Sequence, residues 1–366
     1  MITDSLEKAQ MVVLNPKTGE QLSRYVSILR RVLPIVAFAI PLFILYTLDP
    51  GSFELTWKGR TFYLFFIWLI ILETILSWRK PKPILGRFKS LKIAALGIAL
   101  ALPTVYVIAA NYGINDAIAP FAEKIVSGGA PNVTLSIEYL VLTVLSIVVL
   151  AATYGVYGLQ DFPIAPLFLG MIGLIYMVDS LYPYGKFTPF QIVVPTTTQL
   201  AASVLNMLGF TTRIGYVANN PTYGSMSSLL VIDSAGNRAS ALVAWGCSGI
   251  ESLIIYTITI VLFLRRTPIA TWLKLVYFSI GAVVTYFINA LRIATLFIIS
   301  VNNVHNGGIV SPAANDFHYF YGQLYSITWI MLYPLLLIGI QLLSSRIRTS
   351  EPLTLTNQTS MQQTDA

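Results

Sequence analysis

The stretch Ala244-Trp-Gly-Cys247-Ser-Gly-Ile250 stands where a polar segment of the chain gives way to a long apolar one. Cys247 is the only cysteine in the 366 residues, so it cannot form a disulfide within the chain. It lies beside a predicted helix start, where unpaired N–H groups and the helix dipole lower the pKa of a thiol. The question for function is whether Cys247 is a nucleophile or an apolar residue that only fills space.

The composition around this stretch is that of an integral membrane protein. Hydrophobic residues make up 55% of the chain and charged residues 11%, with a mean hydropathy of +0.71. A soluble domain carries about 25% charged residues, so lipid must solvate much of this surface. The net charge of +7 is therefore expected to set the orientation in the membrane, and no nucleic-acid partner is predicted.

Eight apolar stretches come close to the ~20 residues that a helix needs to cross the hydrocarbon layer. They lack the alternating pattern of strands, so the predicted fold is an all-α polytopic membrane protein. Five spans form an N-terminal membrane half at 30–182, and three form a catalytic half at 247–345. The eight stretches are residues 30–48, 61–78, 93–112, 136–156, 163–182, 249–264, 271–300 and 319–343.

The distribution of Lys and Arg predicts that both termini are cytoplasmic. Basic residues accumulate in the loops on the cytoplasmic side of a membrane, and this orientation puts most of them there. The predicted location is a cell membrane, with a cytoplasmic segment at 1–29 and a disordered cytoplasmic tail at 346–366. The six basic residues left outside are Lys58, Arg60, Lys124, Lys186, Arg213 and Arg238.

An extracytoplasmic insertion is predicted at 183–246, directly before Cys247. Residues Thr197 to Gly209 have one apolar side, which indicates a surface helix that ends at Gly209. The unit brings Cys247 to the outer end of the sixth span; it is either a structural cap or a clamp that holds an extended peptide along a strand edge. The strands are expected at Ile214–Ala218, Ser228–Asp233 and Ala239–Ala244.

Arg292 lies inside the seventh span, in Asn289-Ala-Leu-Arg292-Ile293. Placing a guanidinium there costs roughly 2.5–3.5 kcal/mol on insertion scales, and such residues face the bundle interior or a water-filled cavity. Two interpretations are compatible: a functional cation, or one half of an ion pair with Glu251. Glu251 follows Cys247 by four residues, which predicts that both lie on one side of the sixth span.

The chain has two histidines, and both fall on the outer side of this topology. His305 lies in a loop that reads as a solvated turn, whereas His318 immediately precedes the eighth span. Consecutive antiparallel helices tend to be neighbours, so one outer pocket can hold Cys247, Arg292 and His318. Thiol, imidazole and guanidinium together suit acyl transfer: nucleophile, acid/base and stabiliser of the oxyanion.

These residues resemble the exosortase/archaeosortase family of membrane cysteine transpeptidases. The resemblance rests on Cys247-Ser-Gly-Ile250, Asn289-Ala-Leu-Arg292-Ile293 and His318 in that order, and covers about residues 184–345. The family pattern is a cysteine followed by Ser/Thr-Gly-Ile, then Asn-x-x-Arg-Ile, then a His or Arg. The residues do not distinguish the archaeal branch from the bacterial one.

The resemblance implies a protease and transpeptidase that acts on secreted proteins with a C-terminal sorting signal, made of a motif, a transmembrane helix and a basic tail. Cleavage passes through a thioester, and the substrate is transferred to a lipid or other surface acceptor. Cys247 is then the nucleophile, Arg292 the oxyanion or substrate-orienting cation, and His318 the acid/base. Supporting or substrate-orienting roles are expected for Ser248, Gly249, Glu251 and Asn289.

Two other functions fit parts of the sequence. A different thiol-dependent acyltransferase or hydrolase would use the same cysteine on a lipid acyl donor. A transporter or channel would line a polar path with Arg292 and Glu251, and Glu73 and Asp179 in other spans also favour such a path, although inverted repeats are missing. No cofactor and no metal is expected, because one cysteine and two histidines make a structural zinc site improbable.

Overall fold

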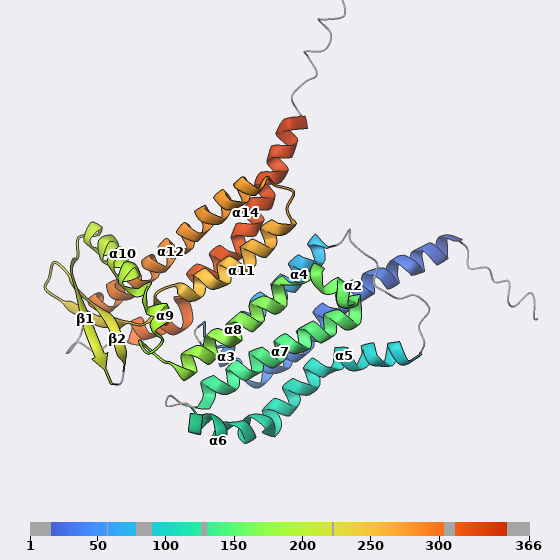
Figure 1. Cartoon of the computed structure of the whole chain (residues 1–366), viewed down its shortest axis with the longest axis horizontal. Helices are drawn as coiled ribbons and strands as arrows, with labels where there is room; N and C mark the ends of the chain where they lie inside the picture. Colours follow the sequence, from blue (N-terminus) through green and yellow to red (C-terminus); the bar gives the residue numbers. More distant parts are fainter. Residues whose placement is uncertain are drawn as a thin grey trace, which may run out of the picture.

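The computed structural model describes residues 16–56, 58–77, 90–125, 130–221, 223–303 and 312–349. Long helices run roughly along one direction, and a small sheet lies at one end of them (Figure 1). This is the polytopic helical membrane architecture with a strand insertion that the sequence predicts. His305 falls outside the described residues, as do the segment before Pro16 and the tail after Thr349.

The N-terminal half is a group of five long helices in which α7 packs on α8, α4 on α8 and α2 on α5. Short helices α3 (Gly51–Glu54) and α6 (Asn115–Ile125) belong to the same half. The five long helices are α2 (Pro16–Leu48), α4 (Thr61–Leu76), α5 (Ser90–Ala109), α7 (Ala130–Tyr154) and α8 (Ile164–Leu181).

Buried carboxylates tie this half together. Glu138 of α7 is buried and accepts hydrogen bonds from Arg60 Nε (2.8 Å), Arg60 Nη2 (2.7 Å) and the hydroxyl of Tyr63 (2.9 Å). Glu73 of α4 accepts the backbone N–H groups of Ile164 and Ala165 at 2.8 and 2.9 Å. Its carboxylate thereby satisfies free N–H groups in the first turn of α8.

The C-terminal half consists of α11, α12 and α14, which pack on one another, and α11 also packs on α8 of the first half. In Figure 1 these three helices form a separate group beside α4, α7 and α8. The elements are α11 (Ile250–Arg266), α12 (Thr271–Asn302), α13 (Pro312–Asp316), the π-helical turn η4 (Phe317–Tyr321) and α14 (Leu324–Thr349).

Within the described residues, six helices are long and apolar enough to cross a membrane. The two remaining predicted spans are helices as well, but shorter: α4 has 16 residues and α11 has 17. The eighth predicted span begins earlier than expected, because α13 and η4 continue into α14 as one stretch from Pro312. The six stretches are Arg31–Leu48, Ile93–Phe121, Val133–Tyr154, Ile164–Leu181, Thr271–Asn302 and Pro312–Leu343.

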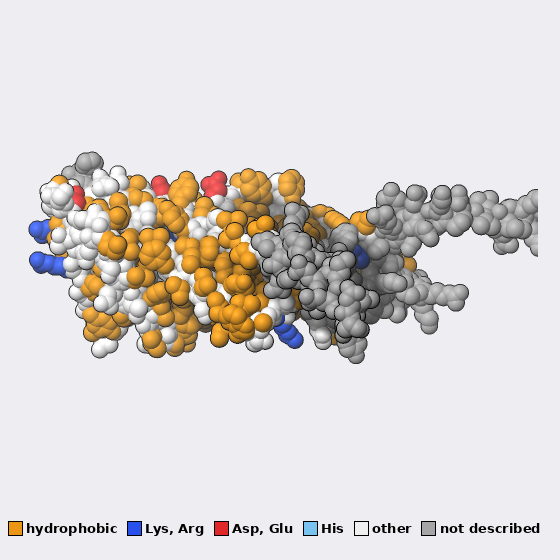
Figure 2. All heavy atoms as spheres, turned by 90° about the horizontal axis from the view of Figure 1, so that it is seen from above, with side chains coloured by type: hydrophobic (Ala, Val, Ile, Leu, Met, Phe, Trp, Pro, Cys, Tyr) orange, Lys and Arg blue, Asp and Glu red, His pale blue; other side chains and the backbone are white. Residues whose placement is uncertain are grey.

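The outer surface of the helices is apolar. Figure 2 shows hydrophobic side chains across the middle of the visible face and Lys and Arg side chains near its ends. A soluble protein does not expose a continuous apolar surface of this kind, so this band is the surface that meets lipid. Exposed apolar residues of the long helices include Phe43, Ile98, Val105, Val144, Leu174 and Val283.

The insertion contains one helix and a three-stranded antiparallel sheet in the order β1-β2-β3. Helix α10 (Val194–Met207) packs on β1 and β2. Gly209 follows it with a left-handed φ of +91°, which confirms the predicted end of the helix. The three predicted strands are present, with longer bounds for the first two: β1 (Thr211–Asn220), β2 (Gly224–Ile232) and β3 (Arg238–Val243).

Candidate active site

Cys247 lies in a short turn between the sheet and α11. After β3 the chain forms the 3-10 turn η3 (Trp245–Cys247), and Gly249 then begins α11 as its N-cap. Gly249 has a left-handed φ of +84°, which glycine adopts without steric cost. The thiol is free and partly buried. The thiol therefore sits in a fixed turn two residues before the helix, at the end of the bundle that carries the sheet.

Asn289 of α12 holds this turn in place. Its Nδ2 donates a hydrogen bond to the carbonyl of Cys247 at 3.1 Å, and the residue is fully buried. The side chain packs directly on Gly249, where a Cβ would lie 2.5 Å from Asn289 Cγ. Asn289 and Gly249 thus form a close contact that fixes the backbone of the nucleophile candidate.

Further contacts to the turn come from Ser248 of the motif and from residues that the motifs do not include. The Thr197 hydroxyl of α10 lies 2.9 Å from the carbonyl of Ser248 and 2.9 Å from the Tyr286 hydroxyl. Ser248 is buried and its hydroxyl donates to the carbonyl of Trp245 at 2.7 Å. Trp245, also fully buried, packs on Phe190 with ring centroids 5.2 Å apart. Thr197, Tyr286 and Phe190 lie far from Cys247 in the sequence, so no local pattern indicated their contacts with the turn.

Gly249→Ala is expected to destabilise the protein and to disturb the Cys247 turn. A left-handed conformation costs an alanine about 1–2 kcal/mol, and the added Cβ would also push against Asn289. The midpoint of thermal unfolding in detergent should fall by several degrees, with loss of activity. Gly339→Ala is the matched control, because that glycine of α14 has open space around it and should show an unchanged or higher midpoint. An unchanged Gly249→Ala variant would contradict the role given to this contact.

One small cavity brings the three predicted catalytic residues together. It is lined by Cys247, Arg292 and His318 and, on its apolar side, by Ile293, Leu296 and Phe317. About 10 Å³ is open to the centre of a water-sized molecule, which is room for about one water. A peptide must therefore displace side chains or approach from the open mouth to reach the thiol.

Arg292 is almost fully buried, with 3% of its surface exposed. Its Nη2 has no hydrogen-bond partner among the described residues. Gly322 lies against the guanidinium, since a Cβ at that position would come within 2.8 Å of Arg292 Nε. A fixed N–H donor without a partner is suited to donate a hydrogen bond to an oxygen on which negative charge develops in a bound substrate.

His318 lies on the π-helical turn η4, between α13 and α14. The backbone carbonyl of the neighbouring Tyr319 accepts hydrogen bonds from the N–H and the hydroxyl of Thr56, each 2.9 Å long. A π-helical turn leaves such carbonyls to outside partners and is frequent at functional sites. The loop after α3 therefore helps to position His318, a contact between the two halves of the chain that the motifs do not reveal.

Glu251 and Arg292 do not form the ion pair that was one interpretation of the sequence. Glu251 is 2% exposed, and neither of its carboxylate oxygens has a hydrogen-bond partner among the described residues. A buried polar group without a partner calls for an explanation, and a group poised for a ligand is one such explanation. The polar atoms of both side chains therefore remain available to a substrate.

Burial raises the pKa of the Cys247 thiol, and the nearby Arg292 guanidinium only partly opposes this effect. The pKa is therefore raised, whereas the predicted helix start had indicated a lowered pKa for this thiol. The reason is the position of the thiol: Gly249, not Cys247, caps α11, and the cavity around the sulfur is largely apolar. The surroundings of Cys247 therefore favour the neutral thiol over the thiolate.

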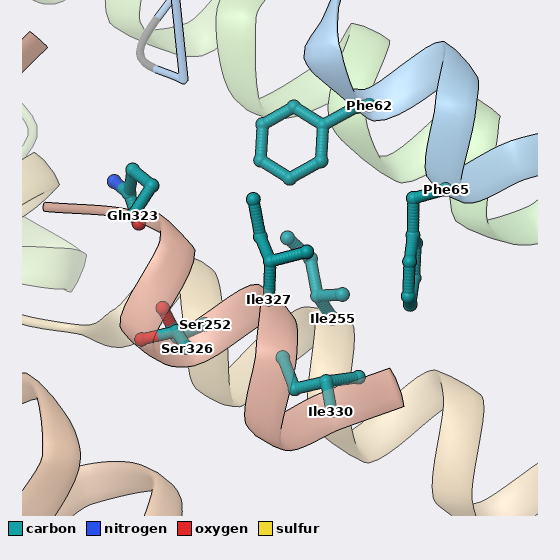
Figure 3. Close-up of a pocket in the computed structure, with 8 residues that line it drawn as sticks. All are labelled: Phe62, Phe65, Ser252, Ile255, Gln323, Ser326, Ile327 and Ile330. Atoms are coloured by element: carbon teal, nitrogen blue, oxygen red, sulfur yellow. The ribbon is translucent and has the colours of Figure 1, made fainter. Parts of the chain in front are cut away.

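A second cavity lies between the two halves of the bundle (Figure 3). Phe62 and Phe65 of α4 face Ile327 of α14 across it, with Ser252 and Ile255 of α11 beside them. The remaining residues of the lining are Gln323, Ser326 and Ile330. The cavity is mainly apolar, so it offers contact to hydrocarbon rather than groups for chemistry.

The comparison with protein families gives one match: the family model of the transmembrane exosortases fits residues 56–335. The similarity therefore reaches well into the N-terminal half, beyond the part from about residue 184 that the motifs indicate. The comparisons with curated proteins and with solved structures found no match. Because the matched region covers most of the chain, the protein belongs to the transmembrane exosortase family.

Proposed function

We propose that this exosortase is a membrane-embedded cysteine protease and transpeptidase that cleaves the C-terminal sorting signal of secreted proteins. The freed protein is transferred to a lipid or another surface acceptor. Membership of the family supports a membrane transpeptidase in general. The observation that carries the specific proposal is the cavity shared by Cys247, Arg292 and His318.

In the first half-reaction, His318 accepts the proton of the Cys247 thiol and the sulfur attacks the carbonyl carbon of the scissile amide. Arg292 stabilises the negative oxygen of the tetrahedral intermediate. The C–N bond then breaks, His318 returns the proton to the leaving amine, and a thioester remains on Cys247. The raised pKa of the thiol supports the need for a base at this step.

In the second half-reaction, an acceptor nucleophile attacks the thioester carbonyl and His318 takes its proton. The C–S bond breaks and the thiol of Cys247 is restored. Water in place of the acceptor would give hydrolysis instead of transfer.

The supporting residues hold the backbone of the Cys247 turn or orient the substrate. Asn289 and Gly249 position Cys247 through their mutual contact, and buried Ser248 closes the turn. Glu251, without a partner for either oxygen, orients a polar or cationic group of the substrate. These residues are positioning residues, whereas Cys247, Arg292 and His318 meet the reacting atoms.

The site lies on the extracytoplasmic face with both termini in the cytoplasm, as the distribution of Lys and Arg predicts. A substrate that is itself a helix docks between the spans of the protein, with its cleavage motif beside Cys247. The apolar band of the outer surface supports the approach of such a helix through the membrane. The insertion at 183–246 lies at the same end as the turn and contributes the clamp.

The transporter alternative loses two of the four charged residues that suggested it. Glu73 accepts backbone hydrogen bonds from α8 and lies 3.5 Å from Arg266 Nη2. Asp179 forms an ion pair with Lys58, with 2.5 Å between the charged atoms. Both carboxylates have structural partners, so they do not require a polar path. A thiol-dependent acyltransferase acting on a lipid remains the alternative use of the same cavity.

The thioester can be tested by trapping it. Cells that express the protein together with a secreted protein bearing a C-terminal transmembrane signal are treated with hydroxylamine, which cleaves thioesters. The expected product is the secreted protein shortened at its C-terminus and ending in a hydroxamate, found by mass spectrometry. The Cys247→Ala variant should give none of it. Shortened protein without hydroxamate in both strains would contradict the proposal.

A further inference from the structure

Strand β3 leads directly into the turn of the candidate nucleophile. It ends at Val243, and the 3-10 turn that contains Cys247 begins at Trp245. We propose that the free edge of β3 binds the substrate segment upstream of the cleaved bond as an added strand, parallel to β3. This inference rests on the proposed function and deepens it, since it assigns the mode and direction of peptide binding.

The turn between β2 and β3 fixes which backbone groups of β3 face its free edge. The N–H of Asp233 donates to the carbonyl of Asn237 at 3.1 Å, and the N–H of Gly236 donates to the carbonyl of Asp233 at 3.2 Å. Asp233 and Asn237 therefore form the closing hydrogen-bonded pair of the hairpin. Such pairs alternate along an antiparallel ladder with pairs whose backbone groups face outward. Counted from the closing pair, the hydrogen-bonded pairs are Val231↔Ala239, Leu229↔Ala241 and Ser227↔Val243.

Arg238, Ser240 and Leu242 consequently turn their N–H and C=O groups away from β2. These three residues are exposed, whereas Ala239 and Val243 are buried. Among the described residues, no backbone or side-chain hydrogen bond is made to the outward groups of these three. A row of unpaired groups at a sheet edge is a template for another strand.

The open edge stops where β3 leaves the sheet. Beyond Val243, Gly185 takes the position next to β2: it bridges Gly224, and its N–H donates to the carbonyl of Tyr223 at 2.8 Å. A strand added to β3 therefore cannot continue along β2. It has to turn with the chain toward Cys247, which places its next residues at the cavity.

The direction of the added strand follows from the order of the substrate. Its folded part precedes the cleavage motif, and its transmembrane helix follows the motif. The substrate chain thus runs from the sheet end of the protein toward the membrane, as β3 does on its way to α11. Two chains that run in the same direction side by side pair in parallel.

The opposite edge of the sheet does not fit this role, although it is exposed too. By the same alternation, the backbone N–H and C=O groups of Thr212, Ile214 and Tyr216 of β1 point away from β2. The residues next to them in β1 are the ones that form the hydrogen-bonded pairs with β2. Strand β2 separates β1 from β3, and the chain leaves β1 for β2 and not for the cavity. The β1 edge is therefore the matched control for the β3 edge.

Cysteine cross-linking tests the proposal directly. Cys247→Ala removes the only thiol of the chain and is expected to leave uncleaved substrate in the membrane. In this background, Ser240→Cys and Leu242→Cys are combined with single cysteines placed along the substrate upstream of the cleavage site, and disulfides are measured after mild oxidation. If a substrate position bonds to residue 240, the position two residues nearer the C-terminus should bond to residue 242.

The controls separate the possible outcomes. Ile214→Cys on β1 should cross-link to the substrate at most a tenth as strongly. The reversed order of positions, which indicates antiparallel pairing, overturns the parallel assignment. Equal cross-linking at residues 214 and 240, or none at 240 and 242, would overturn the proposal that the substrate binds along the β3 edge. None of these results tests the proposed function. That proposal is tested by whether uncleaved substrate accumulates in Cys247→Ala cells.

A proline scan gives a second readout that does not require oxidation. Proline is tolerated on an edge strand where its missing N–H faces outward, but it removes a donor for an added strand. Leu242→Pro should lower the rate of processing by about tenfold relative to Ile214→Pro at equal amounts of protein in the membrane. Equal rates for the two variants would overturn the proposal.

Discussion

Cys247→Ala is expected to reduce substrate processing by at least about a thousandfold, the scale found when a nucleophile is removed from a hydrolase. No other thiol in the chain can replace it. The measurement is the ratio of cleaved to uncleaved substrate in cells that express a tailed secreted protein. Normal processing by the alanine variant would rule out Cys247 as the nucleophile.

Two further variants show whether the loss is chemical. Cys247→Ser keeps the size of the side chain but replaces a thiol with a much weaker nucleophile, so it should be nearly as inactive as alanine. The double variant Cys247→Ala/His318→Ala should be no worse than Cys247→Ala alone, since residues that act in one step are not additive. Thermal unfolding of the single variants should stay close to that of the wild type, because the partly buried thiol makes no disulfide.

The helices were the most predictable part of the fold. An apolar stretch of about twenty residues has few alternatives to a membrane helix, since every backbone group must be satisfied within the segment. The helix end at Gly209 and the three strands also followed from local signals, namely the glycine itself and the turn residues between the strands. What local signals missed was the start of the last span, which lies at Pro312 and not near residue 319.

The sequence motifs predicted which three polar residues meet in one cavity but not the contacts that hold them, and the catalytic roles of these residues stay predictions. The motifs singled out Cys247, Arg292 and His318, and the cavity contains all three. Contacts between distant segments, such as Thr56 with the carbonyl of Tyr319, leave no mark in a single sequence. The prediction of a lowered pKa for the Cys247 thiol was wrong for a related reason. The pKa of the thiol depends on which apolar side chains surround the sulfur, and a single sequence does not reveal them.

Arg292→Met is expected to separate activity from stability. Removal of one donor that stabilises an oxyanion lowers the rate of acyl transfer by about a hundredfold to a thousandfold. The same change should leave the midpoint of thermal unfolding in detergent unchanged or raise it. Arg292 is buried, its Nη2 has no partner among the described residues, and it forms no ion pair with Glu251, so its charge does not stabilise the fold there.

Arg292→Lys is the matched variant that tells charge from geometry. Lysine keeps the positive charge but lacks the planar fork of the guanidinium, whose five N–H donors are fixed in direction. If Arg292 acts by aimed donation, the lysine variant should recover only a small part of the activity; if charge alone matters, it should recover most of it. An Arg292→Met protein that processes substrate at the wild-type rate would remove Arg292 from the mechanism. A protein that is inactive because it unfolds at a clearly lower temperature would instead make Arg292 structural. The proposal requires the combination of lost activity and retained stability, since a partnerless buried cation is kept for its chemistry.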